Sequence, residues 1–258
     1  MTILVFYFAS GVLFSVFTNF KFYNLKPKSK SLGVGIGMSS TWWSSQHNRH
    51  HAMPQRLKHD VDLDTLPLIA FDSKVVNDPK KQSNWFLRYQ SCLFLLLDCS
   101  IVAALWKLYL HPRHVLKRRA GIQIVCMTLH YGIAYQFGLA NYLCSCWLAS
   151  MYMFSSFAVS HTHLPVNTGK LHWVEYALMH TMDVSPVFWC DWWMGYLNYQ
   201  IEHHLFPTMP EFRQPRIQER IRALAKKHGI PFYCTSYCDA LKRTLMNLEE
   251  VAKELREA

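Results

Sequence analysis

Two short stretches of this 258-residue sequence carry histidines at a spacing that suits a metal site: QHNRHH at residues 46–51 and QIEHH at residues 200–204. In a helix, residues i, i+3 and i+4 share one face, so each stretch would gather its side chains into a small volume. In a chain with 14 histidines, chance gives the HxxHH pattern an expected count of only about 0.04. We therefore interpret both stretches as metal-binding. Their candidate ligands are His47, His50, His51, Gln200, His203 and His204.

The donor set favours iron over zinc. Zinc is satisfied by about four ligands and its structural sites usually include Cys, but no CxxC lies near either stretch. A site with many His ligands suits iron, and two irons more easily than one. Activation of dioxygen by iron beside an acyl chain would join the histidines to the apolar sequence around them. The pairs Cys144/Cys146 and Cys234/Cys238 are weaker metal candidates that packing explains as well.

The chain between the two stretches is apolar enough to enter a membrane. Residues 121–160 contain no Lys, Arg, Asp or Glu, which is enough for two crossings at about twenty residues each. Residues 85–110 are also apolar, but Arg88, Asp98 and Lys107 disfavour a simple crossing. We expect this part to lie in the interface or to re-enter from the cytoplasmic side. Both histidine stretches must reach one site, so the number of crossings between them must be even.

Charge and cysteine usage indicate orientation and compartment. The net charge of +10 favours anionic partners, but the charge-free residues 121–160 exclude a nucleic-acid binder. The basic cluster at residues 117–119 is placed in the cytoplasm by the positive-inside rule. The 8 cysteines form no regular framework, as expected of reduced thiols. Residues 2–17 lack the features of a signal peptide and indicate a membrane segment that has lost its beginning.

Two other kinds of sequence flank the apolar stretches. Residues 55–83 are rich in charged residues and predict a solvated loop. Residues 213–228 and 238–256 alternate charged and apolar positions at helical spacing. The predicted fold is an all-α integral membrane protein, whose transmembrane helices carry a cytoplasmic helical cap with the histidine-rich di-iron site. We expect one domain over residues 1–235 and an amphipathic helical tail over residues 236–258.

Four motifs resemble the membrane fatty acid desaturases, specifically the front-end (Δ5/Δ6-type) subgroup. Gln200 at the start of the last histidine motif is the mark of that subgroup. The resemblance implies a di-iron centre, O2 as co-substrate, electrons from cytochrome b5 and its reductase, and an acyl-CoA or phospholipid acyl chain as substrate. It also implies a multi-pass protein of the endoplasmic reticulum membrane, with the His clusters facing the cytoplasm. The motifs are WWSSQHNRHH (42–51), KHDVDLDTLPLIAFD (58–72), SHTHLP (160–165) and LNYQIEHHLFPTMP (197–210).

The resemblance also assigns residues. His163, before Leu164-Pro165, matches the histidine of the family's extra ligand segment. The sequence leaves His161 open as a metal ligand or as a hydrogen-bond donor of the pocket, and leaves His180 and Asp183 open as supports of the ligands or as ordinary packing residues. By position, the full set of metal ligands implied is His47, His50, His51, His163, His203, His204 and Gln200.

Two family features have no match here. The first histidine box, HxxxH or HxxxHH, should lie near residues 10–15, yet no histidine precedes His47. The fused cytochrome b5 domain with its HPGG motif is also missing from the sequence. We expect a chain that is N-terminally incomplete, whose residues 1–258 alone yield no new double bond. An inactive fragment or pseudoenzyme, or a related lipid hydroxylase, stays open, as do the Δ5 or Δ6 position, the chain length and the acyl carrier.

Overall fold

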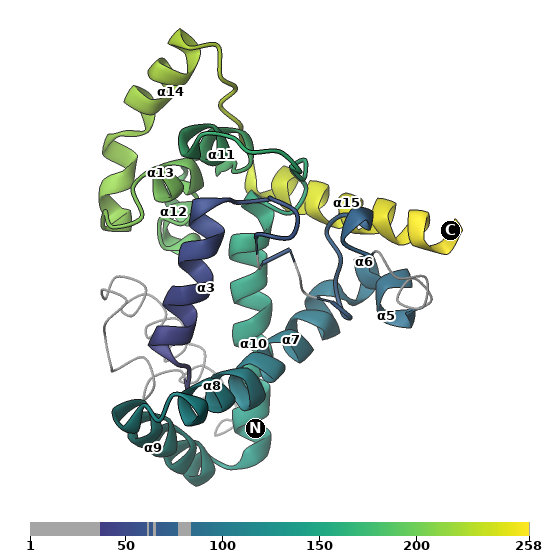
Figure 1. Cartoon of the computed structure of the whole chain (residues 1–258), viewed down its shortest axis with the longest axis vertical. Coiled ribbons are helices and arrows are strands. Elements are labelled where there is room, and N and C mark those ends of the chain that lie inside the picture. Colours follow the sequence, from purple (N-terminus) through teal and green to yellow (C-terminus); the bar gives the residue numbers. More distant parts are fainter. Residues whose placement is uncertain (1–36, 61, 64–65, 77–83, 258) are drawn as a thin grey trace. The chain divides into compact units, whose positions relative to one another are not determined.

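The structure is a computed structural model that describes residues 37–60, 62–63, 66–76 and 84–257. Helices dominate these ranges (Figure 1), which confirms the predicted helical class. Within them, two short strands, β1 (Asp183–Val184) and β2 (Cys234–Thr235), pair in parallel. The expected positions of the missing histidine box and of the first apolar segment lie outside the described residues.

The chain divides into two compact units. The first consists of Met1–Ser45 with Cys99–Met153, and the second of Gln46–Asp98 with Phe154–Ala258. Helices α3 (Ser40–Ala52) and α10 (Leu139–Phe157) each belong partly to both units. The other helices of the first unit are α7 (Cys99–Leu105), the π-helix η3 (Trp106–Leu110), α8 (His111–Lys117) and α9 (Gly121–Phe137).

Two helical runs are long and apolar enough to cross a membrane by length and composition: Gln90–Lys117, with 28 residues, and Leu139–Ser160, with 22. The first run covers most of residues 85–110, for which an interfacial position stays a prediction. Asp98, which disfavours a simple crossing, is fully buried in the structure. Helix α9 has 17 residues and spans about 26 Å, slightly less than a hydrocarbon core of about 30 Å.

The second unit is built from short elements and one long helix. Before the apolar runs lie η1 (Ser73–Val75), α5 (Trp85–Arg88), α6 (Gln90–Leu93) and the π-helix η2 (Phe94–Asp98). After them come η4 (Ala158–Ser160), α11 (Trp173–Met179), α12 (Phe188–Met194), α13 (Gln200–Leu205), η5 (Glu211–Arg216), α14 (Gln218–Lys227) and α15 (Tyr237–Glu257).

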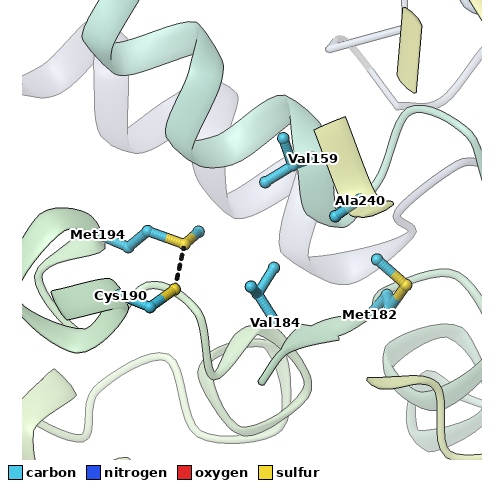
Figure 2. Close-up of a cluster of buried hydrophobic side chains, with 6 residues drawn as sticks. All are labelled: Val159, Met182, Val184, Cys190, Met194 and Ala240. Atoms are coloured by element: carbon cyan, nitrogen blue, oxygen red, sulfur yellow. Dashed lines mark hydrogen bonds between the residues drawn. The ribbon is translucent and has the colours of Figure 1, made fainter. Parts of the chain in front are cut away.

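Helix α15 packs into the core of the second unit. Its residue Ala240 joins an apolar cluster around Val159 and Val184 (Figure 2). Further along, Val251 and Leu255 belong to a second cluster on η1 and α5. Tyr237–Glu257, within the part that the sequence set apart as a tail, thus forms an amphipathic helix whose apolar face is buried in this unit. The buried positions on α15 are Ala240, Thr244, Leu248, Val251, Ala252 and Leu255.

The segment after α3 differs from the solvated loop that its composition predicts. Asp60, Ile69 and Ala70 are buried. The fully buried side chain of Gln90 satisfies the backbone here: Oε1 accepts from the Ala70 amide at 2.9 Å, and Nε2 donates to the carbonyls of Ala70 at 2.9 Å and Leu248 at 3.0 Å. Hydrogen bonds to a side chain twenty residues away therefore allow the apolar part of this segment around Ala70 to be buried.

Candidate metal centre

Six histidines from three distant parts of the second unit lie together as two groups of three. In each group the ligand atoms are within 4.8 Å of one another. Neighbouring residues on one helix enter different groups, because successive side chains point in directions about 100° apart. Thus His50 and His51 on α3 separate, as do His203 and His204 on α13. We call His47, His51 and His203 the first trio, and His50, His161 and His204 the second trio.

The first trio has the dimensions of a site for one ion. The Nε2 atoms of His47 and His51 are 2.9 Å apart. Two nitrogens at about 2.1 Å from one metal, at about a right angle, would be separated by about 3 Å. The ring of His203 lies 4.6 Å from that of His51 and 5.7 Å from that of His47.

The second trio is equally compact and adjoins the first. The ring of His50 lies 4.7 Å from His161 and 4.9 Å from His204, and these two rings are 4.9 Å apart. Between the trios, the rings of His51 and His204 stack at 4.2 Å. Two adjacent groups of three nitrogen donors fit two metal ions side by side better than a single ion.

The buried ring nitrogens support this fit. Among the described residues, the Nδ1 atoms of His51, His203 and His204 are buried without a hydrogen-bond partner. An unsatisfied buried polar atom costs about 1 to 3 kcal/mol, so three such atoms in one cluster indicate a partner such as a metal ion. The six imidazoles are buried or half-buried, and each can offer a nitrogen lone pair to a cation. Together they form a ligand set for a transition metal.

Burial keeps most of these rings neutral and hence able to bind a cation. Desolvation and then the neighbouring histidines lower the pKa of His47, His51 and His204 well below the usual value. The pKa of His203 falls to about 4, through burial and the proximity of His50. Burial is also the main cause that lowers the pKa of His161, to about 3. A neutral imidazole keeps the lone pair that a metal requires.

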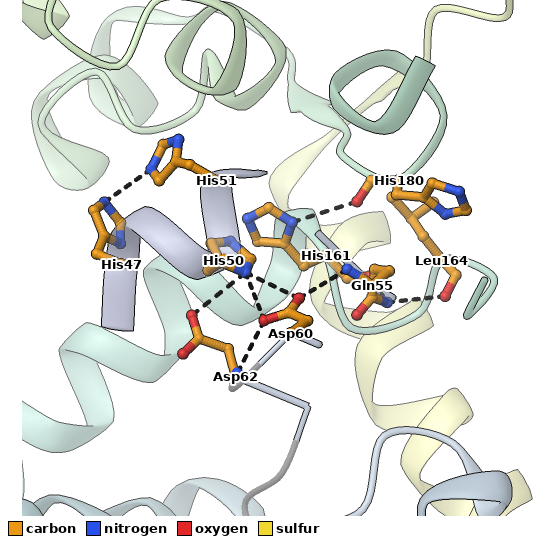
Figure 3. A network of polar contacts seen from close by, with 9 residues as sticks. All are labelled: His47, His50, His51, Gln55, Asp60, Asp62, His161, Leu164 and His180. Carbon is orange, nitrogen blue, oxygen red and sulfur yellow. Dashed lines mark hydrogen bonds and ion pairs between the residues drawn. The ribbon is translucent and has the colours of Figure 1, made fainter. Parts of the chain in front are cut away.

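His50 differs because two carboxylates face it (Figure 3). Burial lowers its pKa, but Asp60 and Asp62 outweigh that effect and raise the pKa to about 9. His50 Nδ1 lies 3.0 and 3.1 Å from the two carboxylate oxygens of Asp60 and 3.5 Å from Asp62 Oδ2. With Nδ1–H donated to Asp60, Nε2 is the nitrogen left for a metal. Sequence reasoning missed this role of Asp60, although KHDVDLD was one of the four quoted motifs.

The fatty acid desaturase family model matches residues 29–236. The chain belongs to the fatty acid desaturase family. It is 47% identical over 232 residues to an acyl-lipid (8-3)-desaturase of Rebecca salina, which covers 85% of this chain and 54% of that protein. An acyl-lipid (8-3)-desaturase of Thraustochytrium sp is 45% identical over 234 residues, with 85% and 53% covered.

A more distant relative is an acyl-lipid (9-3)-desaturase of Physcomitrium patens, 29% identical over 242 residues, which cover 86% of this chain and 46% of that protein. The desaturase chain therefore spans about half the length of the curated relatives it matches. No solved structure matches it.

The desaturase structure places His161, and not His163, beside the other histidines. Residues 161–164 form a turn, closed by the Leu164 amide donating to the His161 carbonyl at 2.9 Å. In this turn His161 joins the second trio, whereas Nδ1 of His163 lies 3.5 Å from Thr244 Oγ1 on α15. Burial and the nearby Arg243 lower the His163 pKa to about 4. The sequence expectation named His163 as a ligand and left His161 open.

The remaining predicted residues surround the two trios of this desaturase chain. Gln200, the first residue of α13, is buried with Oε1 unpaired and lies in neither trio. His180 Nδ1 lies 2.8 Å from the Pro165 carbonyl, and the His180 carbonyl lies 3.5 Å from Nδ1 of His161. Asp183 accepts from the Ile201 amide at 2.9 Å and from Gln218 Nε2 at 2.8 Å. Asp183 thereby anchors the start of the helix that carries His203 and His204.

Proposed function

We propose that this chain contributes the metal centre of a front-end acyl desaturase. The reaction is O2-dependent: it introduces a cis double bond into a polyunsaturated acyl chain, on the carboxyl side of an existing double bond. The observation that carries the proposal is the pair of adjacent histidine trios within a chain that matches the desaturase family over residues 29–236. The names of the two acyl-lipid (8-3)-desaturases support the substrate class.

Iron is the metal that we assign to the trios. His47, His51 and His203 would hold one ion, and His50, His161 and His204 the other. When bound, iron supplies the oxidising power toward an unactivated C–H bond that side chains lack. This assignment gives three histidines to each metal. Gln200 stays a ligand predicted from the resemblance, and in our proposal His161 takes the place that the resemblance gives to His163.

The residues of the chain prepare this site in three ways. Burial of His161 and His204 excludes water from the second trio. The low pKa values of five of the six rings leave their lone pairs free at neutral pH. Asp60 orients His50 and supplies negative charge beside two cations. The remaining task of the protein is to hold the acyl chain so that a single carbon pair reaches the metals.

We further propose a place for this chain in the cell. An acyl-CoA or a phospholipid acyl chain is the substrate, and cytochrome b5 with its reductase supplies electrons. The protein is a multi-pass resident of the endoplasmic reticulum membrane with the trios toward the cytoplasm. The apolar runs Gln90–Lys117 and Leu139–Ser160 support membrane insertion, and the basic cluster at residues 117–119 supports a cytoplasmic side for that connection.

Product analysis in yeast tests the function. Cells fed di- and tri-unsaturated fatty acids would express residues 1–258 either alone or with an upstream HxxxH segment in place of residues 1–18. We expect Δ5 or Δ6 products from the second version and none from the first. His203→Ala should remove iron and product together, because its helical neighbours cannot replace a lost ligand. Full iron and turnover in His203→Ala, or a hydroxylated product in place of an alkene, would overturn the proposal.

A further inference from the structure

We propose that Gln55 is a positioning residue that brings His161, rather than His163, into the second trio. This inference rests on the metal centre proposed above. Gln55 is 2% exposed, and its Nε2 donates to the carbonyls of His161 at 2.7 Å and Leu164 at 3.0 Å (Figure 3). The side chain of Gln55 thus binds both ends of the turn that contains His161 and His163.

The backbone of Gln55 reaches the other side of the same trio. Its amide donates to Asp60 Oδ2 at 2.7 Å, and this carboxylate faces His50 Nδ1. Its carbonyl accepts from the Asn167 amide at 2.8 Å. Gln55 therefore connects Asp60, whose carboxylate faces His50, with the segment that contains His161. His161 is 106 residues away from Gln55 in the sequence.

The conformation of Gln55 agrees with a specific role. Its φ is 57°, in the left-handed region where residues other than Gly and Asn are uncommon. Such a conformation is strained and persists only where its surroundings determine it. Here the three bonded backbone and side-chain groups of Gln55 determine it, and all of them point to Asp60 or to residues 161–167.

The bonds of Gln55 explain the choice between the two histidines. Its side-chain Nε2 donates to the carbonyls of His161 and Leu164 and so fixes the backbone of the turn. In this conformation the His161 ring lies beside His50 and His204, whereas His163 lies beside Thr244 on α15. In the described part of the chain, the hydrogen bonds of Gln55 lead to Asp60 and to residues 161–167, and none leads to the first trio. Loss of the side-chain bonds should therefore affect one metal position and spare the other.

Cobalt(II) titration of the purified full chain tests this selectivity. Absorption of bound Co²⁺ would be followed in the wild type, Gln55→Met and Gln90→Met. Met keeps the length of Gln but cannot donate. Gln90 is the matched control, because it is fully buried and its Nε2 also donates to two distant carbonyls, those of Ala70 and Leu248. We expect Gln55→Met to weaken one of two binding steps by about tenfold to hundredfold, and Gln90→Met to change neither step.

His161→Ala, alone and combined with Gln55→Met, completes the experiment. If Gln55 acts through His161, the double variant should bind Co²⁺ no more weakly than His161→Ala. Gln55→Asn, which tolerates the left-handed conformation but is too short to reach both carbonyls, should reproduce the selective loss even if Gln55→Met folds poorly. Equal weakening of both steps, the same effect in Gln90→Met, or additive losses in the double variant would overturn the inference. A wild type that takes up no Co²⁺ would overturn the metal centre itself.

Discussion

Replacing Asp60 by Asn should weaken metal binding at the second trio, and more strongly at high pH than at neutral pH. The change keeps the shape of the side chain and removes the charge that faces His50 Nδ1 at 3.0 Å. In the metal-free protein burial opposes the charged ring, but the carboxylates raise its pKa from 6.5 to about 9. This rise corresponds to about 3 kcal/mol of preference for the protonated ring.

The same carboxylate favours a bound metal ion, so the two cations compete for His50. At pH 7, two units below its pKa, the proton weakens metal binding to the wild type by about a hundredfold, and this competition disappears near pH 9. In Asp60→Asn, Asp62 alone opposes the effect of burial on the ring, so less proton remains to be displaced. Near pH 9 we therefore expect Asp60→Asn to lower the metal affinity by the full effect of losing a carboxylate partner, about tenfold to hundredfold. At pH 7 we expect a smaller decrease in affinity.

Competition with a chelator at pH 7 and pH 9, with Co²⁺ as the metal, measures these affinities. The control is Asp62→Asn, since Asp62 lies farther from His50, at 3.5 Å, and its side chain is 44% exposed. Thermal unfolding without metal gives a second readout: because the folded-state pKa of His50 is raised, its stabilisation is complete below about pH 6.5 and lost as pH rises through about 9. Asp60→Asn should flatten this dependence. An equal loss at both pH values, or equal effects of the two variants, would refute the reasoning.

Three further predictions concern the ligand segment, the core and the membrane topology. His161→Ala should lose about one bound Co²⁺ per chain and His163→Ala should keep both; the reverse result would favour the sequence assignment over the structure. Leu248→Ala, at a fully buried position of α15, should lower the free energy of unfolding by about 2 to 5 kcal/mol, whereas Met246→Ala, at a 60% exposed position, should leave it nearly unchanged when both are unfolded in detergent. A glycosylation acceptor inserted near His114 should stay unmodified in microsomes, because we expect two crossings after it and a cytoplasmic location; efficient glycosylation would instead assign a crossing to the helix that contains His114.

Local pattern alone identified the helical class and most of the histidines. His47, His50 and His51 share a helix face by spacing, as do His203 and His204, and the structure places all five together. The amphipathic character of residues 238–256 likewise predicted the helix α15. These features depend on residues within one or two turns of each other, which is the range over which sequence periodicity carries information.

The environment of the histidines was decided by contacts between distant residues. Asp60 lies in a segment with the composition of a solvated loop, yet it is 3% exposed because His50 and the Gln55 amide bind its carboxylate. The burial of Ala70 depends on Gln90, twenty residues farther along the chain. Composition cannot distinguish a solvated charge from one that is buried beside a partner.

The sequence by itself determined that this chain is a helical, histidine-rich member of the desaturase family, because family motifs and helical spacing are written in neighbouring residues. Only the tertiary structure decided how the histidines divide into two trios and which histidine of SHTHLP joins them. That choice depends on the conformation of the turn at residues 161–164. His161 and His163 are two positions apart in this turn, and their side chains lie on opposite sides of it. The turn is held by Gln55, more than a hundred residues earlier in the chain, so no local pattern could reveal which side faces the metal centre.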